Sequence, residues 1–100
     1  MYIVVENVHV NLKKRYRKLK SMLRKEWEVS FISQLNRLLS IADVHIFHSP
    51  GRFIVASLKY IEKPEYERLA ITLVLVDGEL NIIVKYERRT NNLHVELWWA

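Results

Sequence analysis

Apolar residues between positions 12 and 42 recur at steps of three or four along the chain. This spacing places them on one side of an α-helix, because about 3.6 residues complete each turn. No Gly or Pro interrupts the segment, so the pattern predicts one long helix, with Asn11 suited to cap its first turn. Steps of four outnumber steps of three, so the apolar stripe drifts around the axis, and the helix must bend or lie under a curved sheet. The stripe comprises Leu12, Tyr16, Leu19, Leu23, Trp27, Phe31, Leu35, Leu38 and Ala42, widened by Ile32 and Leu39.

On both sides of this segment the pattern changes to a period of two, which is typical of β-strands. Residues 2–10 are rich in Val and Ile and predict a first strand. After the helix, the alternation predicts strands over residues 44–48, 53–61, 69–76, 79–88 and 93–99. The segments between them are Ser49-Pro50-Gly51-Arg52, the polar stretch 63–67, the preferred hairpin turn Asp77-Gly78, and Asn91-Asn92.

The predicted order is an N-terminal strand, one long helix and then about five antiparallel strands. This order indicates a single α+β domain over residues 1–100, with the helix packed on one face of a curved antiparallel sheet. The arrangement resembles the cystatin-like order. Protease-inhibiting cystatins carry a Gln-x-Val-x-Gly loop in the first hairpin after the helix, whereas this chain has Ser49-Pro50-Gly51 there. The resemblance therefore implies the fold alone and no inhibitory function.

Positive charge is concentrated in one short run of the predicted helix. Eight of the sixteen Lys and Arg residues lie between positions 13 and 25, and no acidic residue interrupts them. The other eight basic residues face eleven acidic ones, so the surplus of +5 resides entirely on this run. On a helix, these cations cover the sides that the apolar stripe leaves free. Lys14, Lys18, Arg24 and Lys25 lie most directly opposite the stripe.

We expect this run to bind the phosphate backbone of DNA or RNA. Like charges at i,i+4 repel each other, and a helix selected for stability alone would carry acidic residues near its N-terminus. Tyr16 and Trp27 lie on the stripe, so stacking on bases is not expected and binding should show little sequence discrimination. Six phosphate contacts would give a slope of log K against log salt of about −5 on a duplex. The predicted binding residues are Lys13, Lys14, Arg15, Arg17, Lys18, Lys20, Arg24 and Lys25, with Arg37 as a weaker addition.

Other interpretations of the run stay open. One alternative is that the basic run is simply a solvated helix face. Another is that Glu62, Glu65 and Glu67 neutralise it, within the chain or across a dimer. An amphipathic helix on an anionic membrane is disfavoured, because the apolar stripe is needed to cover the sheet. The alternative function is a protein-interaction or inhibitor module, viral or accessory, whose basic face binds an acidic protein surface.

Catalytic and metal-binding patterns are sparse in this chain. It has no Cys, and Gly51 and Gly78 are its two glycines, so it has no thiolate site and no Gly-rich phosphate loop. His45 and His48 are three apart on a predicted strand and would point to opposite faces. His94 and Glu96 share a face but are too few for a metal site. We therefore expect no enzyme activity, no metal and no cofactor.

The remaining expectations concern location and assembly. No apolar run is long enough to span a membrane, and the apolar N-terminus lacks a basic leader, so we expect a cytoplasmic protein. Few Gly and Pro residues together with many charged ones suit a thermophile source. Trp98 and Trp99 alternate on the last predicted strand, so one ring points outward and favours a homodimer.

Overall fold

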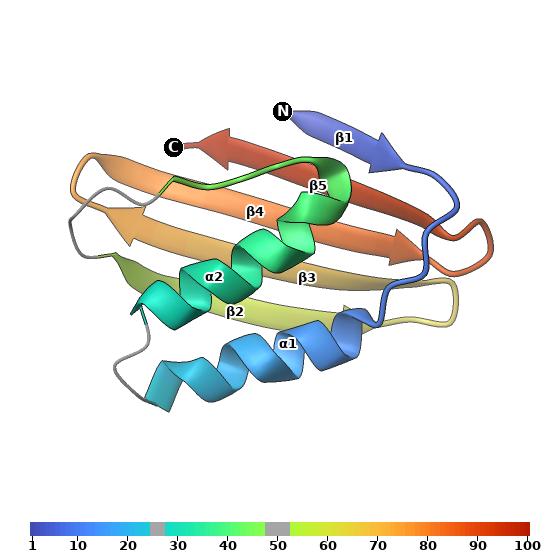
Figure 1. The fold of residues 1–100 in the computed structure, drawn as a ribbon, viewed down its shortest axis with the longest axis horizontal. Coiled ribbons are helices and arrows are strands. Elements are labelled where there is room, and N and C mark those ends of the chain that lie inside the picture. The colour runs from blue at the N-terminus through green and yellow to red at the C-terminus, as the bar shows by residue number, and fades with distance from the viewer. Residues whose placement is uncertain (25–27, 48–52) are drawn as a thin grey trace.

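The computed structural model describes residues 1–24, 28–47 and 53–100 of the chain (Figure 1). Two helices with short 3-10 extensions follow a first strand, and four longer strands complete the fold. In chain order the elements are β1 (Tyr2–Val5), α1 (Leu12–Ser21), η1 (Met22–Arg24), α2 (Glu28–Leu39), η2 (Ser40–Ala42), β2 (Ile54–Glu62), β3 (Tyr66–Leu75), β4 (Gly78–Glu87) and β5 (Asn92–Trp99).

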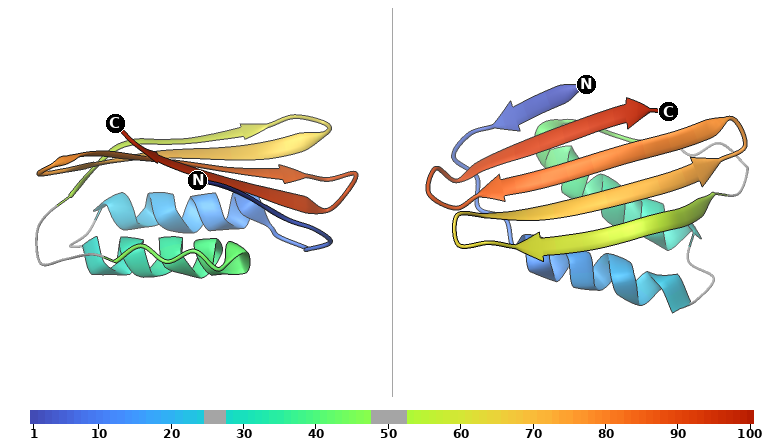
Figure 2. Two further views of the ribbon diagram at one scale, coloured as in Figure 1. Left: turned by 90° about the horizontal axis from the view of Figure 1, so that it is seen from above. Right: turned by 180° about the vertical axis from the view of Figure 1, so that it is seen from behind.

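The five strands form one antiparallel sheet in the order β1-β5-β4-β3-β2. Both helices cover one face of this sheet, and the opposite face is open (Figure 2). Alternate residues of the three central strands are buried under the helices, whereas their neighbours on the open face are partly exposed. This arrangement confirms the predicted α+β class and the curved antiparallel sheet. The buried strand residues are Leu69, Ile71, Leu73, Leu80, Ile82, Val84, Tyr86, Leu93, Val95 and Leu97.

The prediction of one long helix is wrong, because the chain forms two helices that lie side by side and run in opposite directions (Figures 1 and 2). A single helix over residues 12–40 would be about 43 Å long. The longest dimension of the whole protein is 39 Å. A straight helix would therefore project beyond the sheet and leave part of its apolar stripe in water. Folding back brings both halves of the stripe onto the same apolar face.

Because the chain forms two helices, one residue that was predicted to lie in the core is exposed. Leu12 and Leu19 of α1 are buried as expected, and so are Phe31, Leu35 and the other stripe residues of α2. Leu23 is 37% exposed, contrary to the prediction. It lies in η1, where about three residues per turn rotate successive side chains further than in an α-helix. Met22 packs against the core in its place, and Trp27 lies outside the described residues.

Several strand boundaries also differ from the predictions. The first strand ends at Val5 rather than Val10, and Asn7 adopts a left-handed conformation with φ of 56°. Residues 44–47 form no strand. Instead, the Asn36 side chain of α2 accepts from Ile46 N–H at 2.8 Å and donates to Ile46 C=O at 3.0 Å. The side-chain amide thus takes the place of a strand partner. His48 and the predicted turn 49–52 lie outside the described residues.

Two leucine substitutions distinguish the observed pair of helices from a single continuous helix. Leu19→Ala removes a fully buried side chain, so it should lower the free energy of unfolding by about 2–5 kcal/mol. Leu23→Ala should cost less, at about 1 kcal/mol, because this residue is already 37% exposed and loses less buried apolar area. Chemical denaturation of both variants measures the difference. Equal losses would contradict the position of Leu23.

Candidate nucleic-acid interface

The basic run begins at a capped helix N-terminus. The Asn11 side chain accepts a hydrogen bond from Lys14 N–H at 3.0 Å, which confirms the predicted cap. The first turn of α1 contains no acidic residue, and its cations face an unfavourable helix dipole. Because α1 ends at Ser21, Lys18 and Lys20 lie in its last turn, where the dipole favours positive charge. The electrostatic cost of the run therefore falls mainly on the first turn.

Most of the predicted binding residues project into solvent from α1. Arg15 is half-buried at the margin of the apolar stripe, as expected for a long side chain that rests its stem on the core. The Arg24 side chain and Lys25 lie outside the described part of the chain. Arg37 is exposed, but it belongs to α2. The prediction that it lies on the same helix as the other cations is therefore wrong. The exposed cations of α1 are Lys13, Lys14, Arg17, Lys18 and Lys20.

These exposed cations form two rows on α1. Successive residues are rotated by about 100°, so Lys13, Arg17 and Lys20 share one side of the helix. We call these three the β2-side row, because Lys13 Nζ reaches Glu62 Oε2 of β2 at 3.5 Å. Lys14 and Lys18 form the outer row, turned about 110° away from it. The sequence predicts the cations but not which of them lie beside the sheet.

Neutralisation of the run by acidic residues, one of the alternatives left open, occurs at a single ion pair among the described residues. Glu62 pairs with Lys13, but it also lies 3.3 Å from Arg88 Nη2. Glu67 is buried and lies 3.8 Å from Arg88, on the inner face of the sheet. The basic helix is therefore not buried against an acidic patch. Most of its positive charge faces solvent.

A polar cluster around the buried Glu67, which sequence reasoning missed, lies beneath the start of α1. The Tyr60 hydroxyl donates a hydrogen bond to Glu67 Oε1, and Arg88 approaches the other carboxylate oxygen. Burial, reinforced by this hydrogen bond and by the charge of Glu67, raises the pKa of Tyr60 well above its ordinary value. The sequence pattern places Glu67 in the polar stretch 63–67 between two strands, whereas β3 begins at Tyr66 and carries the Glu67 side chain to the buried face of the sheet.

Tyr16 connects the basic helix to this cluster. Its ring stacks on the Tyr60 ring, with centroids 5.2 Å apart and planes at 15°. Lys20 Nζ lies 5.8 Å from the Tyr16 centroid, close enough for a weak cation–π contact. Tyr16 is half-buried and packs against the core, as the apolar stripe predicts. Its ring is therefore occupied within the protein and is not free to stack on a base.

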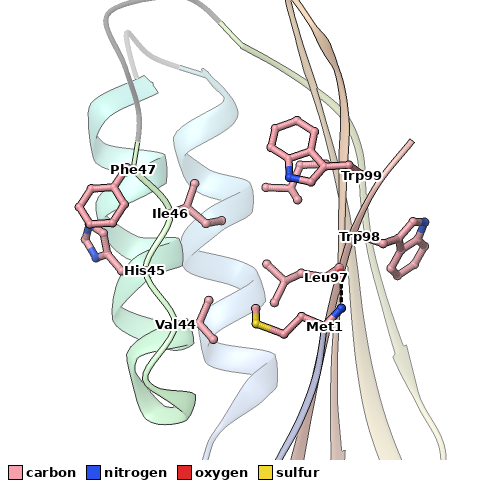
Figure 3. Close-up of a pocket in the computed structure, with 9 residues that line it drawn as sticks. Met1, Val44, His45, Ile46, Phe47, Leu97, Trp98 and Trp99 are labelled. Carbon is pink, nitrogen blue, oxygen red and sulfur yellow. Dashed lines mark hydrogen bonds between the residues drawn. The ribbon is translucent and has the colours of Figure 1, made fainter.

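The two C-terminal tryptophans point to opposite sides of β5 (Figure 3). Trp99 points toward the helices, beside an apolar pocket of about 500 Å³ that Val44, Ile46 and Leu97 also line. Trp98 points away and is 40% exposed. β5 lies between β1 and β4, so it forms a sheet edge only at its last residues, beyond Leu97, which is hydrogen-bonded to Met1. The homodimer expected from these rings stays a prediction.

The histidines that suggested a metal site are placed apart from one another. His45 lies outside any strand, and its ring contacts Phe47. His94 lies between Tyr2 and Glu87 on the open face of the sheet, with Nε2 2.8 Å from Glu87 Oε1. Within residues 1–24, 28–47 and 53–100, no group of three or more His, Asp or Glu side chains is arranged to hold a metal ion. In the same residues, no helix has the length and hydropathy to cross a membrane.

The chain was compared with protein-family models, with curated proteins and with solved structures, and none of them matched. Functional inference therefore depends on the geometry and charge of the chain itself.

The Tyr60–Glu67 contact predicts a pH-dependent contribution to stability. Tyr60→Phe should lower the free energy of unfolding by about 1.5–3 kcal/mol near neutral pH, because it removes a hydrogen bond to a buried carboxylate. The raised pKa means that the folded state retains the phenol proton while the unfolded state loses it. The contribution of this hydrogen bond to the free energy of unfolding is thus complete below the ordinary tyrosine pKa of about 10, and it declines as the pH rises above that value.

Urea denaturation of the wild type and Tyr60→Phe at pH 8 and above pH 10 measures this effect. The stability gap between the two proteins should narrow at the higher pH. A gap of constant size would show that Tyr60 titrates equally in both states.

Proposed function

We propose that this protein binds nucleic acid through α1, by contacts to the phosphate backbone without sequence discrimination. The observation that carries the proposal is the set of five exposed cations on a ten-residue helix, of which only Lys13 meets an acidic side chain among the described residues. The proposed role is binding rather than catalysis. We place it in the cytoplasm, where nucleic acid is accessible.

The electrostatics of α1 favour a polyanionic partner. Pairs such as Lys14 and Lys18 lie one turn apart and repel each other by a few tenths of a kcal/mol, at about the level typical of i,i+4 pairs. A nucleic acid relieves this repulsion and releases its own condensed counterions on binding. Ten residues of helix are about 15 Å long, and a duplex carries one charge per about 1.7 Å of axis. Each exposed cation of α1 can therefore find a phosphate nearby.

The side chains around the cations support backbone contact rather than base recognition. Tyr16 is stacked on Tyr60 within the protein. The exposed surface of α1 otherwise consists of Lys and Arg, together with Ser21, whose hydroxyl donates to Lys18 C=O. Base readout needs polar groups held toward the base edges, whereas these flexible cations act on phosphate charge. Binding should therefore follow charge density.

Charge reversal on α1 tests the proposal. Lys14→Glu/Lys18→Glu should weaken binding to a random-sequence duplex and reduce the slope of log K against log salt by about 2, since each phosphate contact contributes about 0.9. Arg17→Glu/Lys20→Glu should have a similar effect, because a duplex attracts the whole helix surface. Fluorescence anisotropy over a range of salt concentrations measures both.

The matched control is Lys59→Glu/Arg89→Glu, which makes the same change in net charge at exposed positions outside α1. This variant should retain most of the wild-type affinity and slope. If all three double variants lose binding equally, net charge is responsible and α1 is not the site. If wild-type protein shows no salt-dependent binding, the proposal is wrong.

A further inference from the structure

Among the described residues, no backbone group pairs with the outer edge of β2. In the part of the chain that the structure describes, β3 is the only strand beside β2. Lys63 N–H donates to Tyr66 C=O at 2.8 Å, and the antiparallel register continues from this pair to Ile61↔Arg68 and Lys59↔Ala70. Hydrogen-bonded and non-hydrogen-bonded pairs alternate in such a ladder. The backbone N–H and C=O groups of Leu58, Tyr60 and Glu62 therefore point outward, away from β3.

A β-bulge limits how much of this edge is available. The register shifts between Val55 and Ser57, so the regular part of β2 extends from Ser57 to Glu62. Bulges and charged side chains are the features by which proteins prevent unwanted pairing at sheet edges. The six regular residues are still enough to pair with a short extended segment. β1, at the opposite edge, has four residues.

The basic helix lies along this edge. In Figures 1 and 2, α1 follows β2 in the opposite direction and extends past the edge of the sheet. The Lys13–Glu62 pair at 3.5 Å fixes the start of α1 at the end of β2, and the Tyr16–Tyr60 stack fixes the next turn. The β2-side row, with Arg17 and Lys20, therefore lies beside the position that a further strand would occupy. Lys59 is exposed on the other face of the same edge.

We propose that the edge of β2 accepts an extended acidic peptide as a sixth strand. Its backbone would pair with the outward N–H and C=O groups of Leu58, Tyr60 and Glu62, as in other cases of strand addition. Its side chains would alternate between the two faces of the sheet. Carboxylates on the helix side would meet Arg17 and Lys20, and a carboxylate on the open face would meet Lys59.

The charge around the edge identifies the kind of partner. A second copy of this chain pairing β2 with β2 would bring two β2-side rows together, and like charges across an interface are unfavourable. A nucleic acid can neutralise the same cations, but its sugar–phosphate backbone cannot continue the peptide ladder. An acidic peptide satisfies both the unpaired backbone groups and the positive charge. This inference does not depend on nucleic-acid binding through α1.

Amide hydrogen exchange followed by NMR tests the strand pairing directly in the wild-type protein. The probe is an eight-residue blocked peptide of alternating Glu and Val. On addition of this peptide, the amides of Leu58, Tyr60 and Glu62 should become protected, whereas Lys59 and Ile61 already pair with β3. A peptide of alternating Lys and Val, and the acidic peptide with a central Pro, should give no protection. Acidic peptide that binds without protecting these three amides would overturn the proposal.

Two variants of equal net charge test the role of the β2-side row. Arg17→Glu/Lys20→Glu should weaken binding of the acidic peptide about ten-fold, since two exposed ion pairs at up to about one kcal/mol each are lost. Lys14→Glu/Lys18→Glu should change it less than about three-fold, because the outer row faces away from β2. Equal loss in both variants would show non-specific attraction instead of docking at the edge.

A nucleic-acid titration separates this proposal from the proposed function. Loss of duplex binding in both variants, with loss of peptide binding in Arg17→Glu/Lys20→Glu alone, supports both. Peptide binding with edge protection and no duplex binding supports the peptide site alone. If the duplex protects the three edge amides as strongly as the peptide does, the protection does not report strand pairing and the peptide proposal fails.

Discussion

The structure depends on one constraint, which is that the sheet has a single apolar face and the chain must cover it with helix. The central residues of that face, such as Ile82, Val84 and Val95, are inaccessible to water under the helices. One helix presents a stripe only about 100° wide or slightly more, which is too narrow to cover five strands. Two helices side by side provide the width. The longest dimension of the protein, 39 Å, limits the length of each helix. The rest of each helix circumference is then free to carry charge.

This constraint places α1 at the β2 side of the sheet, and the polar cluster of Tyr60, Glu67 and Arg88 fixes its position along β2. Exposed pairs such as Lys13–Glu62 are individually weak, at about 0–1 kcal/mol. Glu67 is different, because a buried carboxylate requires the Tyr60 hydroxyl and the charge of Arg88. Tyr60 in turn stacks on Tyr16 of α1. The cluster thus fixes the basic helix relative to the β2–β3 hairpin. Both candidate binding surfaces, the exposed cations of α1 and the edge of β2, depend on this placement.

Local patterns in the sequence predicted the features that depend on local physics. The period of two in β3, β4 and β5 and the stripe from Phe31 to Ala42 appear in the structure. The predicted hairpin appears as well, but its two turn residues are Val76 and Asp77, because Gly78 pairs with Leu75 as the first residue of β4. The break between α1 and α2 was not predicted, because no Gly or Pro marks it and its cause is the size of a sheet formed mainly by the later residues 54–99. Ile46 likewise pairs with a distant side chain, Asn36, which a strand pattern cannot reveal. The cations of α1 were predictable, but the Lys13–Glu62 pair was needed to show which row lies beside the sheet.

The two rows explain how one helix can serve partners of different geometry. A duplex is a wide cylinder of charge, and it attracts every cation on the solvent side of α1, whether Lys14 or Arg17. An extended peptide is narrow and is held by backbone pairing, so only cations beside the strand edge contact it. The helical repeat of about 100° per residue separates these two sets on the same ten residues. Reversing one row at a time therefore distinguishes attraction by charge alone from recognition that also needs the edge of β2.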